Sequence, residues 1–286
     1  MVGFFSGALR SGICSRFHGR RVRVFSWATV ISYLLHIKNK FLILRMMVPA
    51  MRIAVRMGLS FVYDSFRQVC MLTLIMANGG FKVEDRLSIL CIGDGYGFLS
   101  CLIKEIFPKA RIIFVDLGKT LLFQAYFSKR AFPNCKHILV SEATEPPLLV
   151  DADFVYCAVE YLQYLNKEIF DLAINIDSMQ EMNQNTVKEY FEFMRGHLRQ
   201  KNLFYCCNRK EKIMSGGEVS SIMNYPWKRE DRFLVDEGCP WQAYFLSPHM
   251  TERGYKVFGL RVPFVNFFDG EILHRLAVLT TKESHA

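Results

Sequence analysis

The stretch Leu87–Leu117, LSILCIGDGYGFLSCLIKEIFPKARIIFVDL, decides the fold of this chain. An apolar run opens it and meets glycines at three alternate positions, Gly93, Gly95 and Gly97. Apolar residues then recur at helical spacing over Phe98–Ile106 until Pro108, and a second apolar run closes on Asp116. The pattern predicts a strand, a glycine turn, a crossover helix and a second, parallel strand beside the first.

This unit predicts a site for an adenosine-containing ligand. Glycines at the first turn let a ligand approach the backbone where any Cβ would collide. Asp116 is expected at the tip of the second strand, where its carboxylate can accept hydrogen bonds from both ribose hydroxyls. A dinucleotide site requires G-x-G-x-x-G, but Phe98 occupies the place of its third glycine. The spacing therefore disfavours a nicotinamide-dependent oxidoreductase, as does the absence of a Tyr-x-x-x-Lys pair from the sequence.

With 286 residues, 51% of them apolar, the chain has enough material for the core of one globular α/β domain. Its net charge of +9 is unevenly distributed. Residues 1–63 hold ten of the 36 Lys and Arg residues and no Asp or Glu, whereas the rest holds 26 basic and 27 acidic residues. We therefore divide the chain into a basic N-terminal extension, 1–63, partly helical or disordered, and a domain over 64–286.

Three interpretations of the N-terminal extension stay open. An Arg-rich, acid-free N-terminus can be an organellar transit peptide, or it can lie on an anionic membrane or a nucleic acid. Alternatively, its apolar residues pack on the domain as helices that precede the sheet, which we favour for residues 40–63. For the first 25 residues we favour disorder or a peripheral membrane contact. A nucleic-acid partner is not expected, because the signatures of RNA-binding modules are missing.

Nine scattered cysteines, with no C-x-x-C pair and no His at zinc-ligand spacing, predict neither a disulfide framework nor a metal site. Free cysteines in apolar runs behave as small buried hydrophobes. They indicate a reducing compartment, hence a cytoplasmic protein, with a peripheral membrane contact through the basic N-terminus as one of the open alternatives. The apolar stretches Phe25–Ile37 and Phe41–Met51 are shorter than the ~20 residues that span a bilayer, so no transmembrane helix is expected.

The remaining elements follow from periodicity and turn signals. The predicted helices are Asp64–Ala77, Lys119–Ala131 and Thr186–Leu198. The predicted strands are Phe154–Ala158, with His137–Val140 as the alternative, then Phe170–Ile176, Asn202–Cys207 and an antiparallel hairpin of Tyr255–Val262 with Ile272–Thr280. Residues 211–250 are expected to form loops that shape a substrate pocket.

The G-x-G-x-G spacing resembles motif I of the class I S-adenosylmethionine-dependent methyltransferases, whose members usually carry an acid where this chain has Cys91. Asp94 is placed to substitute for that acid in part. A narrower resemblance, to the sugar O-methyltransferase family, lies in residues 170–209, FDLAINIDSMQEMNQNTVKEYFEFMRGHLRQKNLFYCCNR. The family's strand-end signatures are matched by Asn175, Ser178, Glu181, Met182, Asn208 and Arg209, and its aromatic loop by Tyr225, Pro226, Trp227 and Trp241.

This resemblance implies a Rossmann-like α/β fold with a seven-stranded, mostly parallel sheet, one reversed strand and helices on both faces. It also implies S-adenosyl-L-methionine as cofactor and methyl transfer to a hydroxyl of a sugar or glycan precursor. The residues implied to hold the cofactor are Gly93, Asp94, Gly95, Gly97, Asp116, Asn175 and Ser178. The residues proposed to hold the sugar are Asn208 and Arg209, with Tyr225 and Trp227 stacking on its face.

Methyl transfer to a sugar hydroxyl calls for a general base, because the hydroxyl is a poor acid. Glu181, just beyond a strand end, is the first catalytic candidate, although its carboxylate could equally offset the dipole of the following helix. His274 is the second candidate, although a lone His in an apolar strand is more often a packed core residue. Packing within the loop is likewise the alternative role for Tyr225 and Trp227.

Two other functions differ in class from sugar methylation. A methyltransferase acting on nucleic-acid amines would carry an Asn/Asp-Pro-Pro-aromatic run after the fourth strand, which IDSMQEM lacks. A catalytically impaired protein of the same fold would act as a binding or membrane-associated module, and Cys91 in place of the usual acid favours this alternative.

Overall fold

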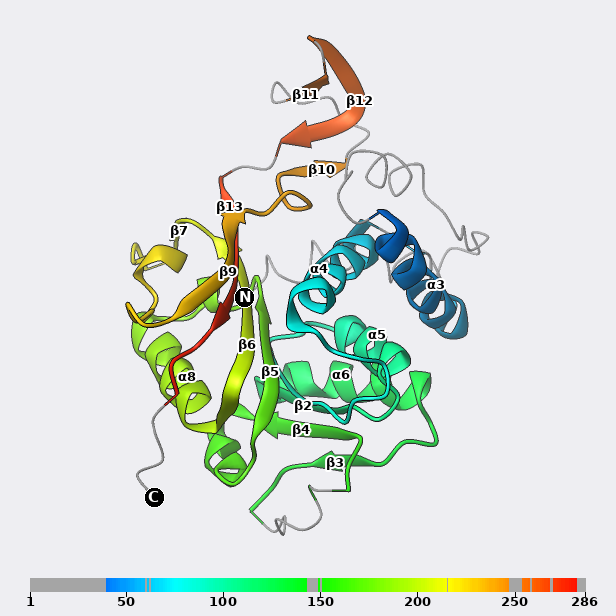
Figure 1. Ribbon diagram of the computed structural model, residues 1–286, viewed down its shortest axis with the longest axis vertical. Helices are drawn as coiled ribbons and strands as arrows, with labels where there is room; N and C mark the ends of the chain where they lie inside the picture. The colour runs from blue at the N-terminus through cyan, green and yellow to red at the C-terminus, as the bar shows by residue number, and fades with distance from the viewer. Residues whose placement is uncertain are drawn as a thin grey trace.

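The computed structural model describes residues 40–59, 61, 63–142, 149, 151–214, 216–246, 254–257, 259–267 and 270–281. Its centre is an eight-stranded sheet (Figure 1). In order across the sheet, the strands are β3 (His137–Leu139), β4 (Phe154–Ala158), β2 (Arg111–Asp116), β1 (Ser88–Ile92), β5 (Phe170–Ile176), β6 (Leu198–Arg209), β13 (Ile272–Val278) and β9 (Arg232–Gly238). The strands from β3 to β6 are parallel, and β13 is antiparallel to both of its neighbours.

The predicted fold class, Rossmann-like α/β with a mostly parallel sheet, is confirmed. The predicted number of seven strands is one too low. Both candidates for the third strand and the unpredicted β9 join the sheet, whereas the predicted strand over 255–262 does not. The preferred candidate, β4, lies beside β2, and the short strand β3 extends the sheet beyond it. The central register sets Ile92 of β1 opposite Val115 and Asn175. The carboxyl ends of β1, β2 and β5 therefore meet at one edge of the sheet.

Helices cover both faces of the sheet (Figure 1). One face carries α3 (Lys40–Met57), α4 (Tyr63–Gly79), α5 (Phe98–Ile106) and α6 (Gly118–Ala131), whose apolar residues form one core with alternate strand residues. The other face carries α8 (Gln184–His197), the 3-10 helix η2 (Val159–Leu165) and a second apolar core. This division follows from the strands, because successive side chains of a strand point to opposite faces.

The helix α3 lies within the basic extension, and its inner face is part of the same core as α4 and α5. At its end, the Arg56 guanidinium is 3.1 Å from the Glu105 carboxylate of α5 and donates to the Ala131 carbonyl of α6. Residues 40–57 therefore pack on the domain as a helix, whereas residues 1–39, with the predicted disorder of the first 25, lie outside the described part. Of the helices described, not one has both the length and the apolar character needed to cross a bilayer.

The C-terminal third departs from the expectation. Residues 211–250, predicted as loop, contain the strand β9, the pair β7 (Lys212–Ile213) and β8 (Val219–Ser220), the 3-10 helix η4 (Ile222–Asn224) and β10 (Tyr244–Leu246). The predicted hairpin of residues 255–262 with 272–280 is wrong. Instead, β11 (Gly254–Val257) and β10 pair with β12 (Leu260–Phe267) in a separate three-stranded sheet, while β13 inserts between β6 and β9. This small sheet stands away from the central one in Figure 1.

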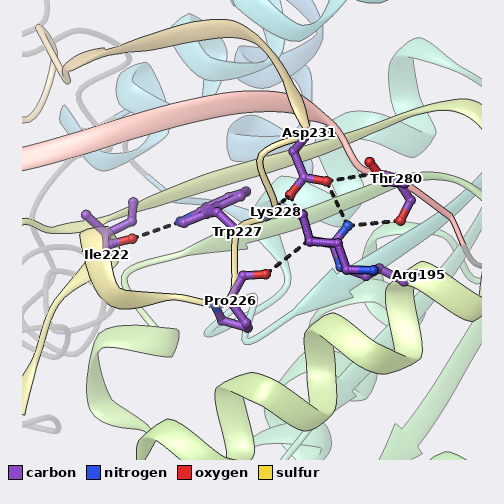
Figure 2. Close-up of polar contacts among 7 residues, drawn as sticks. All are labelled: Arg195, Ile222, Pro226, Trp227, Lys228, Asp231 and Thr280. Carbon is purple, nitrogen blue, oxygen red and sulfur yellow. Dashed lines mark hydrogen bonds and ion pairs between the residues drawn. The ribbon is translucent and has the colours of Figure 1, made fainter.

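A buried ion pair fastens the end of α8 to the start of β9 (Figure 2). Both guanidinium Nη atoms of Arg195 donate to Asp231, each over 2.7 Å, and they also donate to the Thr280 and Pro226 carbonyls. Asp231 in turn accepts the backbone N–H groups of Lys228 and Thr280. Because every charge here has several partners, the pair can hold the loop after η4 and the end of β13 against α8.

Candidate functional site

The glycine bend between β1 and α5 has the geometry that its sequence predicts. Gly93, Gly95 and Gly97 have φ values of 73°, 55° and 88°, in the left-handed region that glycine adopts without steric cost. The Gly93 N–H continues the ladder to the Val115 carbonyl over 3.1 Å, and the Gly97 N–H donates to the Asp94 carbonyl over 2.9 Å. The bend therefore leaves β1 tightly and starts α5 directly at its end.

Space around the bend differs from one glycine to the next. A Cβ built on Gly93 would lie 2.2 Å from the Ser178 hydroxyl oxygen, so this glycine is needed for packing against the turn after β5. A Cβ built on Gly95 would meet no atom within 4 Å, and this residue is exposed. Gly95 is consequently the point at which a ligand can reach the backbone.

Asp94 lies inside the bend and is half-buried. Its Oδ2 accepts the backbone N–H of Ser100 over 2.9 Å, which places the carboxylate at the positive end of α5. Burial raises the pKa of Asp94 to about 7, the hydrogen bonds from Ser100 lower it, and the charge of Asp116 raises it again. The two carboxylates are thus close enough to feel each other's charge.

Asp116 ends β2 on the same edge of the sheet. Its Oδ1 accepts the Leu117 N–H and its Oδ2 accepts the Gln124 side-chain amide, both over 2.7 Å. Burial raises the pKa of Asp116, and these hydrogen bonds lower it. The Thr120 side chain also donates to this carboxylate. A carboxylate has about four acceptor sites, so Asp116 is oriented by α6 and can still accept from a ligand.

The signature residues at the ends of β5 and β6 form one hydrogen-bond network. Asn175 is completely buried; its amide nitrogen donates to the Ile92 carbonyl over 3.0 Å and to the Ser178 hydroxyl over 2.5 Å. Its oxygen accepts from Asn208 over 2.8 Å. Asn208, also completely buried, accepts the Gln180 N–H over 3.1 Å. The network fixes the turn after β5 against the glycine bend.

The network shows which of the predicted site residues lie together. Asn175 and Ser178 lie against the bend, because both donate to the last carbonyl of β1, and the Asn175 side chain is itself completely buried there. Asn208 was predicted to hold the sugar, but its side chain faces Asn175 and Cys206 inside the sheet. The backbone N–H of Arg209 bonds the Gln180 side chain over 2.7 Å, and its own side chain is half-buried.

The two catalytic candidates lie in different surroundings. Glu181 ends the 3-10 helix η3 (Met179–Glu181), is exposed, and its carboxylate is 2.5 Å from the Lys212 ammonium. His274 is completely enclosed in β13, where Nδ1 is 3.2 Å from the Tyr205 hydroxyl and Nε2 is 3.6 Å from Glu237. Burial lowers the pKa of His274 more than the Glu237 carboxylate raises it. Three strand spacings separate β13 from β1, roughly 14 Å.

The aromatic residues predicted to stack on a sugar lie on the α8 face. Trp227 donates its indole N–H to the Ile222 carbonyl over 2.9 Å and packs edge-on against Phe191 of α8, with ring centroids 4.9 Å apart. Tyr225 is buried in the same cluster and contacts the Phe191 ring. Both rings thus take part in the packing of the α8 face, which the sequence alone does not reveal.

One acid at this edge was not among the predicted site residues. Asp177 directly follows β5, is half-buried, and has a φ of 57°, the one positive φ of a non-glycine residue in the described part. Burial raises its pKa, while Arg67 and the Gln242 side chain lower it. Its position immediately after a buried strand was the signal available in the sequence. Backbone strain of this kind tends to occur at functional sites.

The described residues include no group of three His, Cys, Asp or Glu side chains arranged to hold a metal ion. The eight described cysteines are free thiols, and Cys91 is completely enclosed in the core beneath α4 and α5. Burial raises the pKa of the Cys91 thiol, and the charge of Asp94 raises it further. Cys91 thus cannot make the charged contact of an acid at its position, which leaves Asp94 as the acid nearest to the bend.

No protein-family model matches the chain, and no curated protein matches it in sequence. Solved structures resemble it only distantly. They include PKMT2 from Rickettsia typhi (18% identity, TM-score 0.32, 43% of this chain and 21% of that one) and the cyclopropane synthase MmaA2 from Mycobacterium tuberculosis (14%, 0.33, 48% and 42%). A third, described as a sarcosine dimethylglycine methyltransferase from Galdieria sulphuraria, has 13% identity and a TM-score of 0.44, with 61% and 64% covered.

PKMT2 has also been solved in complex with AdoHcy. The chain spans less than two thirds of the length of each of these three structures. Likenesses this distant carry no weight for function, which therefore rests on the residues at the carboxyl edge of β1, β2 and β5. The fold is that of a Rossmann-like α/β protein with an acidic, glycine-lined edge.

Proposed function

We propose that the chain binds S-adenosylmethionine at the glycine bend and transfers its methyl group to a hydroxyl of a sugar or glycan precursor. The observation that carries the proposal is the open Gly95 at the end of β1, with the Asp94 carboxylate at the start of α5 and the Asp116 carboxylate at the end of the neighbouring β2. Within the described residues, no ion pair joins either carboxylate to a basic side chain. Such a site suits a cationic nucleoside, whereas a pyrophosphate would be repelled.

The residues present fit this cofactor. Asp116 can accept hydrogen bonds from a ribose, and Gly95 leaves the backbone accessible. Asp94 offers a negative charge beside that opening. When bound, S-adenosylmethionine supplies a methyl group already activated by its sulfonium.

The protein then has to orient the acceptor and take up its proton. Glu181 is our proposed base, because the network through Asn175 and Ser178 fixes the turn that carries it near the bend. Its ion pair with Lys212 is exposed, so it can open to accept the proton of the hydroxyl. An acceptor could reach the enclosed His274 only after local opening of the sheet.

Replacing Gly95 with alanine tests whether the opening above the bend is a ligand site. A left-handed φ costs an L-residue about 1 kcal/mol, so the variant should fold with a slightly lower melting temperature. The added Cβ occupies the open space, and the affinity for S-adenosylmethionine should fall about tenfold or more, measured by isothermal titration calorimetry. Gly80→Ala is the matched control, because Gly80 has a φ of 66° and also has no atom within 4 Å of its Cβ position. Equal affinities in the two variants would contradict the assignment.

The pH dependence of binding tests the role of Asp94. With the pKa of Asp94 at about 7, raising the pH from 6 to 8 ionises it, which should strengthen binding of the cation by up to about tenfold. The slope should vanish in Asp94→Asn and be smaller for AdoHcy, which lacks the sulfonium charge. The raised pKa has the opposite effect on folding. Because the folded state favours the neutral carboxyl group, the stability of the free protein falls as the pH rises from 3.8 towards 7. A wild-type affinity independent of pH would argue against Asp94 at the cofactor.

The acceptor is tested by transfer of a radiolabelled methyl group from S-adenosylmethionine to a panel of free sugars, nucleotide sugars and a glycan extract. We expect alkali-stable label in the saccharide fraction, as an ether gives, and at least about tenfold less with Asp116→Ala at a cofactor concentration that does not saturate the wild type. Label in protein, lipid or RNA, with none in saccharide, would assign a different substrate to the same cofactor site.

A second function is favoured by Cys91, which is neutral and enclosed where related enzymes carry an acid. In this case the chain would be an impaired methyltransferase-fold protein that acts as a binding module. Calorimetric binding of S-adenosylmethionine without transfer to any member of the panel would support it. A Cys91→Asp variant that gained transfer activity would identify the missing group.

A further inference from the structure

The outward face of α3 combines apolar side chains with arginines. Phe41, Leu44, Val48 and Val55 are 92%, 51%, 43% and 60% exposed. Their spacing of three, four and seven residues sets them along one side of the helix. Arg45 and Arg52, also exposed, lie among them. In Figure 1, α3 is the outermost helix on its side of the sheet, with α4 and α5 beneath it.

Packing in the core does not account for these exposed apolar side chains, which form a stripe along α3. The opposite face of α3 already supplies the core contacts, through Ile43, Met46, Met47, Ala50, Ile53, Ala54 and Met57, all of them buried. Single exposed apolar residues are normal on protein surfaces, but a contiguous apolar strip usually marks an interaction site. Phe41, which is almost fully exposed, is the clearest member of the stripe.

The charge around the stripe has one sign. The helix sequence KFLILRMMVPAMRIAVRM contains four basic residues and no acidic one, and residues 1–63 contain ten basic residues and no acid. Within the described part of the chain, Arg56 pairs with Glu105, whereas no ion pair joins Arg45 or Arg52 to another residue. A partner for this face must therefore be anionic and must also bury apolar groups.

We infer that the outward face of α3 binds an anionic phospholipid surface, with the helix lying in the plane of the interface. Apolar side chains then enter the boundary of the acyl chains, and Arg45 and Arg52 extend to lipid phosphates. Two copies of the chain meeting through this face would bring arginines together without any acid on α3 to offset them. A nucleic acid would leave Phe41, Leu44 and Val48 without an apolar partner. The inference does not depend on the proposed methyl transfer.

Co-sedimentation of the full chain with vesicles tests this inference. Vesicles of phosphatidylcholine mixed with phosphatidylserine should bind the chain, and pure phosphatidylcholine should bind it at least about tenfold more weakly. Added salt should weaken the binding, because exposed charges are screened. The triple variant Phe41→Ser/Leu44→Ser/Val48→Ser should lose binding about tenfold or more, and Arg45→Gln/Arg52→Gln should lose most of the preference for the anionic lipid.

The matched control is Leu122→Ser/Tyr126→Ser/Leu139→Ser, which removes three other exposed large apolar side chains, from α6 and β3. This control should bind vesicles like the wild type, and circular dichroism should show that all variants are folded. Three outcomes would overturn the inference. The first is no binding to anionic vesicles. The second is full binding by the triple variant, which would place the contact in another part of the chain, and the third is a dimer in gel filtration that the triple variant abolishes.

Discussion

Replacing Asp116 with alanine should weaken S-adenosylmethionine binding by roughly 10- to 100-fold in isothermal titration calorimetry. The carboxylate ends β2 beside the bend, and hydrogen bonds to a charged group contribute about 1.5–3 kcal/mol, with tenfold in affinity for each 1.4 kcal/mol. The substitution also removes the partner of Gln124, a buried residue of α6. A loss of affinity therefore has to be separated from a loss of packing.

Gln124→Met provides this separation. The variant removes the same hydrogen bond to Asp116 but keeps the carboxylate, so its affinity for S-adenosylmethionine should stay within about threefold of the wild type, less than one charged hydrogen bond. An Asp116→Ala variant that binds as tightly as the wild type would show that the tip of β2 does not touch the ligand. Equal losses in the two variants would assign Asp116 a structural role only.

The largest effect on stability is expected at the ion pair of Arg195 with Asp231. Arg195→Met leaves Asp231 buried without its cation, which should lower the free energy of unfolding by about 3–5 kcal/mol in urea denaturation. Lys188→Met is the control on the same helix, since its exposed contact with Glu192, at 4.0 Å, should change stability by less than about 1 kcal/mol. A loss in Arg195→Met no larger than in the control would contradict the role of the pair.

The same pair predicts a pH dependence. Burial raises the pKa of Asp231, but the hydrogen bonds from Arg195, Lys228 and Thr280 outweigh it, so the pKa lies below its ordinary value of 3.8. A depressed folded-state pKa contributes stability above the unfolded value, which is lost as the pH falls through the folded value. The wild type should therefore lose more stability below pH 3.8 than Arg195→Met does.

The segment around the bend could be predicted almost to the residue. The local signals are the spacing of its apolar residues, its three glycines and Pro108. They place β1, α5, β2 and Asp116 as observed. The strand β9 was missed because its sequence, RFLVDEG, has only a short apolar run between charged residues and lies at an edge of the sheet. Its partner β13 is 34 or more residues away in sequence, so local patterns could not reveal the pairing.

The roles at strand ends were harder to predict, for a physical reason. A polar residue after a strand can face a ligand, or it can form hydrogen bonds with the backbone of the next turn. The local sequence is the same in both cases. Asn208 was predicted for the sugar, yet its amide bonds Asn175 and the Gln180 N–H. Trp227 was predicted to stack on a sugar, but the long loop that carries it folds onto α8. Both outcomes depend on contacts between distant segments.

The most direct measurement is isothermal titration of the full-length wild-type chain with S-adenosylmethionine at pH 8, above the pKa of about 7 of Asp94. We predict saturable binding with one site per chain, tighter than that of AdoHcy because of the sulfonium. No heat of binding at millimolar S-adenosylmethionine, with the chain shown to be folded, would contradict the assignment of the glycine bend as a cofactor site.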